Sequence, residues 1–154
     1  MERIAVFPGS FDPFTIGHES IVRRAFPMFD RIVIAVGQNV QKDSYFPLDK
    51  KMQWIREVFA SDPQVSVDTY RGLTVSYCGS INATFILRGL RTAADFEYER
   101  AIAQVNKALH PEIETIFLLT LPEHSAINSS IVRDIIRNGG NASPFLPAAM
   151  HLKG

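Results

Sequence analysis

Apolar runs of strand length alternate with amphipathic segments of helix length along this chain of 154 residues. This alternation is typical of βαβ units, which form a parallel sheet. The runs at residues 31–37 and 83–87 are almost entirely apolar, as expected for strands that helices cover on both faces. The run at 64–69 alternates between apolar and polar residues, which predicts an edge strand. The five predicted strands lie at residues 3–7, 31–37, 64–69, 83–87 and 115–119.

Apolar residues at helical spacing, together with capping residues, mark the segments between the strands. Residues 95–109 give the clearest pattern, with an apolar stripe that Pro111 stops. The stripe consists of Phe96, Ile102, Val105 and Leu109. Asn128 can cap a last helix that Gly139 and Gly140 close. The predicted helices begin near His18, cover residues 48–60, 74–81 and 95–109, and follow Asn128.

These elements predict a single α/β domain over residues 1–154, a Rossmann-like open sheet of five parallel strands with helices on both faces. Residues 141–154 carry two prolines and predict a short appended element. No repeat, low-complexity stretch or linker divides the chain. In such sheets a ligand binds beyond the carboxyl ends of the strands, where the loops into the helices gather.

Composition narrows the class of protein. Hydrophobic residues make up 46% of the chain and charged residues 21%, and a chain of this length buries about 68 to 70% of its unfolded surface, so it needs no disulfide or metal to fold. Cys78 is the single cysteine, which we interpret as a buried, inert thiol. Sixteen basic and sixteen acidic residues balance, which argues against a polynucleotide partner. The chain has neither a signal-peptide pattern nor an apolar run of about 18 residues, so we expect no membrane partner and a cytoplasmic location.

Residues 8–18 predict a phosphate site. The segment leaves an apolar run, turns, and enters a helix whose first turn carries His18. A helix N-terminus offers unpaired N–H groups to an anion, and Gly9 and Gly17 allow close approach of the backbone. A histidine there can donate to phosphate oxygens and gain positive charge as they approach. The alternative is ordinary turn chemistry with a solvated surface histidine.

Polar residues follow four of the predicted strands, as a phosphate site at the carboxyl edge requires. They are Ser10 and His18, Lys42, the segment Arg88 to Arg91, and the loop 122–130. Each charge alone is most simply a solvated surface residue. Their placement on one rim favours a cluster that binds a small phosphorylated ligand.

Several of these segments resemble known motifs. Thr15-Ile16-Gly17-His18 resembles the [His/Thr]-x-Gly-His signature of the nucleotidylyltransferase superfamily, and residues 127–133 resemble its second, Ser-rich motif. Residues 8–13, Arg88-Gly89-Leu90-Arg91 and Asp95-Phe96-Glu97-Tyr98-Glu99 together resemble bacterial phosphopantetheine adenylyltransferases, and the resemblance runs from about residue 4 to 146. The first motif marks only the superfamily, whereas the last two are far more specific.

The resemblance implies transfer of AMP from ATP to 4′-phosphopantetheine, giving dephospho-coenzyme A and pyrophosphate in coenzyme A biosynthesis. It also implies a homohexamer and allows coenzyme A to bind as a feedback inhibitor. The attacking phosphate is already anionic, so the chemistry needs positioning and cationic donors rather than a strong base. The resemblance assigns catalysis to His18, Ser10 and Arg91. It assigns the acceptor to Ser10, Lys42, Thr74 and Arg88. It assigns ATP to Ser10, Phe11, His18, Gly89, Leu90, Arg91, Glu99, His124, Ser125, Ala126, Ile127, Asn128, Ser129 and Ser130.

The chain departs from the family pattern at three of these positions. Ser10 replaces the usual threonine, Asn128 stands where serine is common, and His124 where an aromatic residue such as tryptophan is frequent. Asp12 is either structural or helps to hold Mg²⁺ through water. No cluster of carboxylate, His or Cys residues predicts a protein metal site, so Mg²⁺ is expected to arrive with ATP.

Two other functions remain open at this point. One is a related nucleotidylyltransferase that acts on another small phosphate, such as nicotinate mononucleotide or glycerol phosphate. The other is a non-catalytic nucleotide-binding domain on the same scaffold, because a fold alone does not define a function.

Overall fold

The computed structural model describes residues 1–38 and 43–152, so Lys42 lies outside the described residues. The strands are β1 (Ile4–Gly9), β2 (Arg31–Gly37), β3 (Val65–Tyr70), β4 (Phe85–Leu90) and β5 (Glu114–Leu119). The α-helices are α1 (Ile16–Ala25), α2 (Leu48–Val58), α3 (Thr74–Ser80), α4 (Ala93–Leu109) and α5 (Ser129–Arg137). Short 3₁₀ helices cover Phe26–Met28, Pro122–His124 and Ser143–Phe145.

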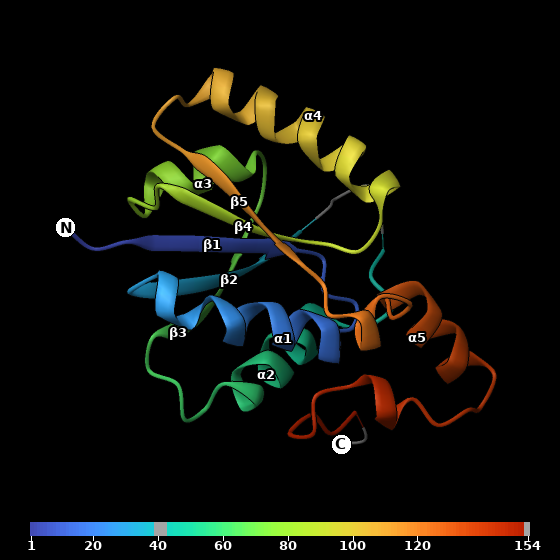
Figure 1. The fold of residues 1–154 in the computed structure, drawn as a ribbon. Coiled ribbons are helices and arrows are strands. Elements are labelled where there is room, and N and C mark those ends of the chain that lie inside the picture. Colours follow the sequence, from blue (N-terminus) through green and yellow to red (C-terminus); the bar gives the residue numbers. More distant parts are fainter. Residues whose placement is uncertain (39–42, 153–154) are drawn as a thin grey trace.

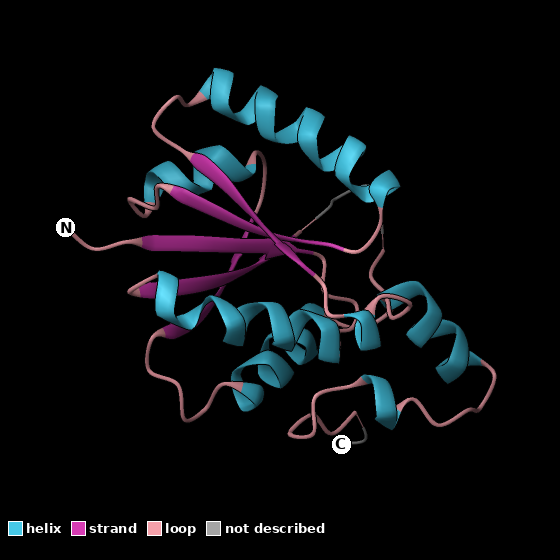
Figure 2. Cartoon of the chain, viewed as in Figure 1, coloured by secondary structure: helices cyan, strands magenta, loops and turns pink. Residues whose placement is uncertain are grey.

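The five strands form one parallel sheet in the order β3-β2-β1-β4-β5. Helices α1 and α2 lie on one face of the sheet, and α3 and α4 lie on the other (Figure 1). Figure 2 shows the loops that leave the strands gathering at one edge, beside α5. The predicted Rossmann-like sheet is therefore confirmed, and β3 is an edge strand as its alternating pattern indicated.

The pairing between β1 and β4 is the shortest in the sheet. These strands pair at Ala5–Phe85 and Val6–Ile86 only, whereas β1 and β2 pair from Ile4–Arg31 to Gly9–Val36. The chain order also reverses direction at this point, because β1 leads to β2 on one side and β4 leads to β5 on the other. Beyond Val6 and Ile86 the two strands separate, which is where an open α/β sheet binds its ligand.

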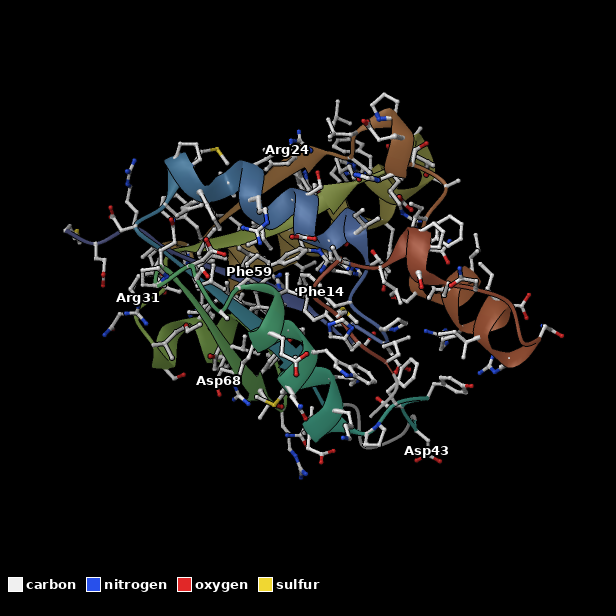
Figure 3. All side chains as sticks on the ribbon, turned by 90° about the horizontal axis from the view of Figure 1, so that it is seen from below. Phe14, Arg24, Arg31, Asp43, Phe59 and Asp68 are labelled. Carbon is white, nitrogen blue, oxygen red and sulfur yellow. The ribbon has the colours of Figure 1, made fainter. Side chains whose placement is uncertain are left out.

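The larger core lies between the sheet and the layer of α1 and α2. Phe14 and Phe59 contact edge to face in its interior, with ring centroids 5.9 Å apart, while the labelled charged side chains lie at the periphery (Figure 3). Leu146 and Met150 are buried in this same cluster, so the segment after α5 is packed into the core.

The smaller core covers the opposite face of the sheet with residues of α3. Val75 and Cys78 belong to it and are buried. Burial raises the pKa of the Cys78 thiol to about 11, so the thiol stays protonated at neutral pH. This agrees with the interpretation of Cys78 as an inert residue that fills space.

The apolar stripe of helix α4 is largely exposed. Although α4 lies over one face of the sheet, none of its residues is buried. Phe96 contacts the Phe117 ring of β5, with centroids 6.3 Å apart. Val105 and Leu109 remain 59% and 53% exposed. The stripe therefore forms an apolar surface that this chain alone does not cover.

Several element boundaries also differ from the pattern. Strand β4 was predicted to end at Leu87 but continues through Leu90, because Arg88, Gly89 and Leu90 pair with β5. The Arg-Gly-Leu segment is thus a strand end rather than a loop. Helix α5 begins after Asn128, whose side chain accepts a hydrogen bond from the Ile131 N–H, as predicted. No helix in the described part of the chain is long and apolar enough to cross a membrane.

Candidate active site

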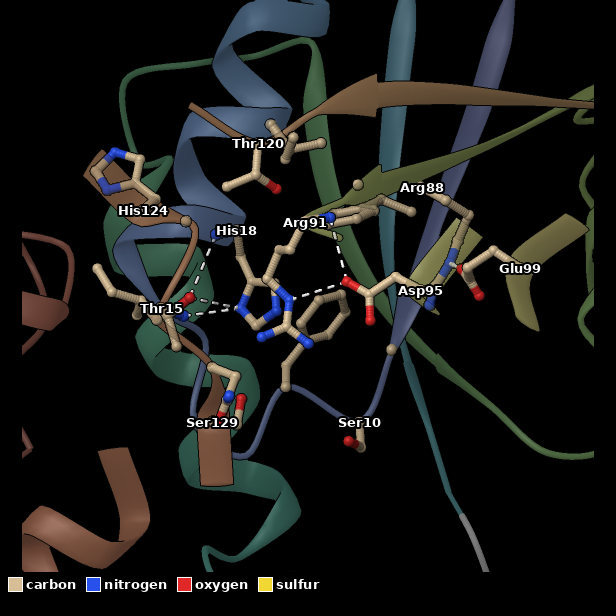
Figure 4. Close-up of a pocket in the computed structure, with 18 of the residues that line it drawn as sticks. Ser10, Thr15, His18, Arg88, Arg91, Asp95, Glu99, Thr120, His124 and Ser129 are labelled. Atoms are coloured by element: carbon tan, nitrogen blue, oxygen red, sulfur yellow. Dashed lines mark hydrogen bonds and ion pairs between the residues drawn. The ribbon is translucent and has the colours of Figure 1, made fainter. Parts of the chain in front are cut away.

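A cavity of about 410 Å³ opens where β1 and β4 separate (Figure 4). It is lined by the end of β1, the start of α1, the end of β4, the first turns of α4 and the loop before α5. The predicted site residues that line it are Ser10, Phe11, His18, Arg88, Gly89, Arg91, Glu99, His124, Ile127, Asn128 and Ser129. Leu90, Ser125, Ala126 and Ser130 do not line it. The structure thus brings most of the predicted rim together.

The imidazole of His18 is oriented by the start of α1. Thr15 caps the helix, and the backbone N–H of Thr15 donates to Nδ1 of His18 at 2.9 Å. The Thr15 hydroxyl in turn accepts from the His18 N–H at 3.3 Å, so the two residues form a reciprocal capping box. Because Nδ1 accepts a hydrogen bond, the proton of the neutral ring belongs on Nε2. The ring therefore keeps one N–H donor for a ligand.

Aromatic rings and arginines determine the charge of His18. The imidazole lies within 5.0 to 6.1 Å of the rings of Phe7, Phe11 and Phe14, measured between centroids. Burial, together with the positive charges of Arg88 and Arg91, lowers the pKa of His18 to about 3. Without a ligand the histidine is therefore neutral at pH 7. Its expected gain of charge as phosphate approaches stays a prediction.

The positive charge of the cavity comes from two arginines on either side of the strand end. Arg88 projects from β4, forms an ion pair with Glu99 of α4, and donates to the carbonyl of Pro8 at 2.6 Å. Arg91 follows β4 and lies 3.4 Å from the carboxylate of Asp95. Asp95 is fixed in turn, because its carboxylate and Thr92 form the capping box of α4. Both guanidinium groups are held in position before any phosphate binds.

Hydrogen bonds within the protein hold the start of α5. The Ser129 hydroxyl donates to the carbonyl of Pro13 at 2.8 Å, and the Ser130 hydroxyl accepts from Arg133. Both hydroxyls are thus engaged within the protein, and only Ser129 borders the cavity. The ring of His124 also borders the cavity, and its Nδ1 is buried without a hydrogen-bond partner among the described residues. Ser129 therefore both borders the cavity and holds the loop between β1 and α1 through the Pro13 carbonyl.

A second cavity of about 200 Å³ adjoins the first. Pro8, Gly9, Arg88 and Glu99 line both cavities. The second cavity is also lined by Thr74, whose hydroxyl lies 2.9 Å from that of Tyr70, and the assignment of Thr74 to the acceptor stays a prediction. The remaining lining combines apolar, amide and hydroxyl side chains from β4, α4 and β5, namely Ile86, Ile102, Ala103, Asn106 and Thr115.

Asp12 has a structural role. Its carboxylate accepts the backbone N–H groups of Tyr45 and Phe46, at 2.8 and 2.9 Å. The residue is 7% exposed and borders neither cavity. Of the two roles left open by the sequence, the structure supports the one that ties two loops together.

The sequence-based prediction missed several residues that border the cavities. They include Asp95, Tyr98, Thr120, Tyr70 and Asn106. Asp95 and Tyr98 belong to a motif that was used only for the family resemblance. Asn106 could have been found from spacing, because residues at 99, 102, 103 and 106 lie on one side of a helix.

Comparison with known proteins places this site in a class. The family model described as cytidylyltransferase-like matches residues 6–135. A putative nicotinate-nucleotide adenylyltransferase from Vibrio parahaemolyticus has the same fold, with a TM-score of 0.68 at 19% identity over 95% of this chain and 94% of that chain. A bifunctional NMN adenylyltransferase/ADP ribose pyrophosphatase from Francisella tularensis gives a TM-score of 0.65 at 17% identity, over 95% of this chain and 45% of that chain. The fold and the family match define a cytidylyltransferase-like nucleotidyltransferase, which is an enzyme.

Curated relatives narrow the class to one family. The phosphopantetheine adenylyltransferase of Flavobacterium psychrophilum is 53% identical over 151 residues, which is 98% of this chain and 99% of the relative. That of Cytophaga hutchinsonii is 48% identical over 147 residues, covering 96% of this chain and 98% of the relative. This chain therefore belongs to the phosphopantetheine adenylyltransferase family, which confirms the resemblance found in its motifs.

Proposed function

We propose that this enzyme transfers AMP from ATP to the phosphate of 4′-phosphopantetheine and releases dephospho-coenzyme A and pyrophosphate. The observation that carries the proposal is the pair of adjoining cavities that meet at Arg88. The larger one is lined by the hydrogen-bond donors and cationic side chains that bind the phosphates of a nucleoside triphosphate. The smaller one combines apolar side chains with hydroxyl and amide groups, which suits the arm of the acceptor.

The reaction needs no general base on the protein. An oxygen of the acceptor phosphate, already anionic, attacks the α-phosphorus of ATP. The bond from that phosphorus to the oxygen bridging the α- and β-phosphates breaks, and pyrophosphate leaves with the electron pair. Charge shifts toward the leaving group, so the protein contributes by holding the two anions in line and by stabilising that charge.

The site offers a separate donor for each part of this charge. Nε2–H of His18 faces the reacting phosphate as a neutral donor, fixed by Thr15. Arg91 supplies positive charge to the phosphates of ATP, and its ion pair with Asp95 keeps it at the rim. The Ser10 hydroxyl, at the end of β1, can hydrogen-bond either reacting phosphate.

Arg88 binds the acceptor phosphate where the cavities meet. It is held by Glu99 and by the Pro8 carbonyl, so its guanidinium is oriented before the substrate arrives. Thr74 and Asn106 line the smaller cavity, where their polar atoms match the amides of a pantetheine arm. Lys42 is assigned to the same substrate by family resemblance. Coenzyme A shares the pantetheine and nucleotide parts of the product, so it is expected to compete for both cavities.

Mg²⁺ is proposed to arrive with ATP, because the carboxylates that line the larger cavity already have partners. No group of three or more His, Cys, Asp or Glu side chains within the described ranges could hold a metal. Asp95 and Glu99 are each paired with an arginine. When bound, Mg²⁺ would neutralise phosphate charge, with oxygens of ATP and water as most of its ligands.

Self-association would cover the apolar surface of α4. Phe96, Ile102, Val105 and Leu109 are 41 to 59% exposed along this helix, and Ile102 also borders the smaller cavity. Contiguous exposed apolar residues mark interaction surfaces. We therefore retain the homohexamer implied by family resemblance, with α4 as the contact between copies of this chain.

A pyrophosphate-release assay with a panel of acceptors tests the function. The panel contains 4′-phosphopantetheine, nicotinate mononucleotide and glycerol phosphate, each with ATP and Mg²⁺. The expected result is turnover with 4′-phosphopantetheine and none above background with the other two. Turnover with another acceptor alone would favour a related nucleotidylyltransferase activity, and ATP binding without any turnover would favour a non-catalytic domain.

A further inference from the structure

Lys51 is a buried lysine that contacts the loop between β1 and α1, residues 10–15. It lies in the first turns of α2 and is 2% exposed. Lysine is almost never fully buried unless its ammonium group has partners. The Nζ of Lys51 donates to the carbonyl of Ser10 and to the hydroxyl of Ser44, each at 2.8 Å. The buried charge therefore acts directly on the backbone of a residue that lines the nucleotide cavity.

Two charged groups face this ammonium. One is Asp12, which lies in the same loop as Ser10. The other is Arg133 of α5, which donates to the Asp12 carbonyl at 2.7 Å and lies 3.9 Å from the Asp12 carboxylate. Burial and Arg133 lower the pKa of Lys51, and Asp12 partly offsets them. The Lys51 ammonium, the Asp12 carboxylate and the Arg133 guanidinium thus form a cluster, and none of the three residues lines the nucleotide cavity.

Three side chains hold the loop through its backbone carbonyl groups. Lys51 binds the carbonyl of Ser10, Arg133 that of Asp12, and Ser129 that of Pro13. The loop is held in this way around an uncommon backbone conformation, because Phe11 has a φ of 46°. A residue other than glycine keeps such a conformation only where its surroundings determine it.

The Ser10 carbonyl also sets the direction of the next amide. In a trans peptide the carbonyl and the following N–H point in opposite directions. The Ser10–Phe11 peptide is not among the cis bonds of the described chain. Because Lys51 holds the carbonyl toward α2, the Phe11 N–H points away from α2, and both residues line the nucleotide cavity.

We propose that Lys51 is a positioning residue of the transfer reaction, which aims the Phe11 N–H and the Ser10 hydroxyl at the phosphates by holding the Ser10 carbonyl. This inference rests on the proposed function. Donors aimed at developing charge lower the barrier more than they strengthen ground-state binding. A displacement of about 1 Å in such a group can reduce the rate by on the order of 100-fold.

The test compares three variants with the parent enzyme in the pyrophosphate-release assay. Lys51→Met keeps most of the side-chain volume and removes the donor, and Lys51→Arg keeps a cationic donor. Arg56→Met is the matched control, because Arg56 is exposed on the same helix. We expect Lys51→Met to lower kcat by about 10- to 100-fold while KM for ATP changes by less than about threefold. Lys51→Arg should recover most of kcat, and Arg56→Met should match the parent.

Stability and an activity-independent signal separate positioning from folding. Each variant is assayed well below its thermal midpoint, and the fraction folded is measured by circular dichroism. In protein labelled with ¹⁵N-phenylalanine, the Phe11 amide should shift when ATP is added to the parent and to Lys51→Arg, and should shift less in Lys51→Met. If Lys51→Met does not fold, Lys51→Gln replaces it under the same criteria, with a partial loss expected because its amide is a shorter, uncharged donor.

Two results would overturn the inference. One is an unchanged kcat per folded molecule in Lys51→Met, and the other is an equal loss in Arg56→Met. Failure of the parent to turn over 4′-phosphopantetheine would instead contradict the proposed function. The response of the Phe11 amide to ATP would still test Lys51 in that case.

Discussion

Replacement of His18 by glutamine separates the two tasks of this residue. The imidazole caps α1 through Nδ1, which leaves Nε2–H for a ligand, and His18 lines the cavity. Glutamine is a preferred residue at this position of a capping box and can keep the hydrogen bond to the Thr15 N–H. Glutamine removes the imidazole Nε2–H donor that lies among the rings of Phe7, Phe11 and Phe14. Alanine would remove both the helix-capping contact and the donor to the ligand. His18→Gln therefore tests the donor separately from the cap.

The expected loss follows from the environment of the ring. Removing one preorganised donor from an active site of this kind costs about 2.7 to 4 kcal/mol of transition-state stabilisation, or about 100- to 1,000-fold in kcat. His18→Gln should show this loss with a Kd for ATP within a few-fold of the parent. His18→Ala should show a similar loss in kcat, together with a fall of about 0.5 to 2 kcal/mol in the free energy of unfolding from the lost cap.

Steady-state pyrophosphate release, ATP titration by calorimetry and urea unfolding measure these three quantities. The parent enzyme and Arg56→Met serve as references for kcat and for stability. If His18→Gln keeps the turnover of the parent, the histidine does not stabilise the transition state. If the variant loses ATP binding in proportion to kcat, the histidine acts in ground-state binding instead.

Four further outcomes follow from the structure. Because burial lowers the pKa of His18 from its ordinary value of 6.5 to about 3, the unfolded chain takes up a proton that the folded protein does not. The His18 contribution to stability should therefore be complete above pH 6.5 and decline toward pH 3, and urea unfolding of His18→Gln should show a weaker decline than the parent. Asp12→Asn should lower the free energy of unfolding by about 1 to 3 kcal/mol, since a buried acceptor of two backbone N–H groups is weakened, and an altered Mg²⁺ requirement without loss of stability would contradict the structural role. Arg91→Gln should lower kcat/KM for ATP by at least about 10-fold, as expected for a lost charge-assisted contact, and an unchanged value would remove Arg91 from the phosphate site. Val105→Lys should reduce the assembly measured by light scattering, and an unchanged mass would show that α4 is not the contact.

The fold could be predicted well because its dominant signal is local. Most strands of this parallel sheet are nearly continuous apolar runs, and the Asn128 side chain marks the start of the last helix by a bond within three residues. The caps at Thr15 and Thr92 follow the same local rule, although the sequence-based prediction did not name them. The end of β4 could not be predicted in this way. Arg88 and Gly89 interrupt the apolar pattern, and they remain in the strand because β5 pairs with them across the sheet.

The orientation of α4 and the role of Lys51 depend on tertiary structure. A stripe of apolar residues indicates that a helix has an apolar side, but it does not identify the surface that covers it. Lys51 is one of two adjacent lysines in an amphipathic helix; its spacing from Ile55 and Val58 places it on the apolar side, but a charged residue there does not reveal its partners. Only the packing of α2 beneath the β1 loop shows which of the two is 2% exposed and bonded to Ser10.

The central claim is that the α-phosphate of ATP is attacked between His18, Ser10 and Arg91. A crystal structure of the enzyme with dephospho-coenzyme A bound tests it most directly, because that product joins the transferred AMP to the acceptor. We predict the AMP phosphate within hydrogen-bond distance of Nε2 of His18, Arg91 at the phosphates, and the pantetheine arm in the smaller cavity beside Arg88 and Thr74. A product whose phosphates lie away from His18 and Arg91, or whose arm lies outside the smaller cavity, would contradict the account.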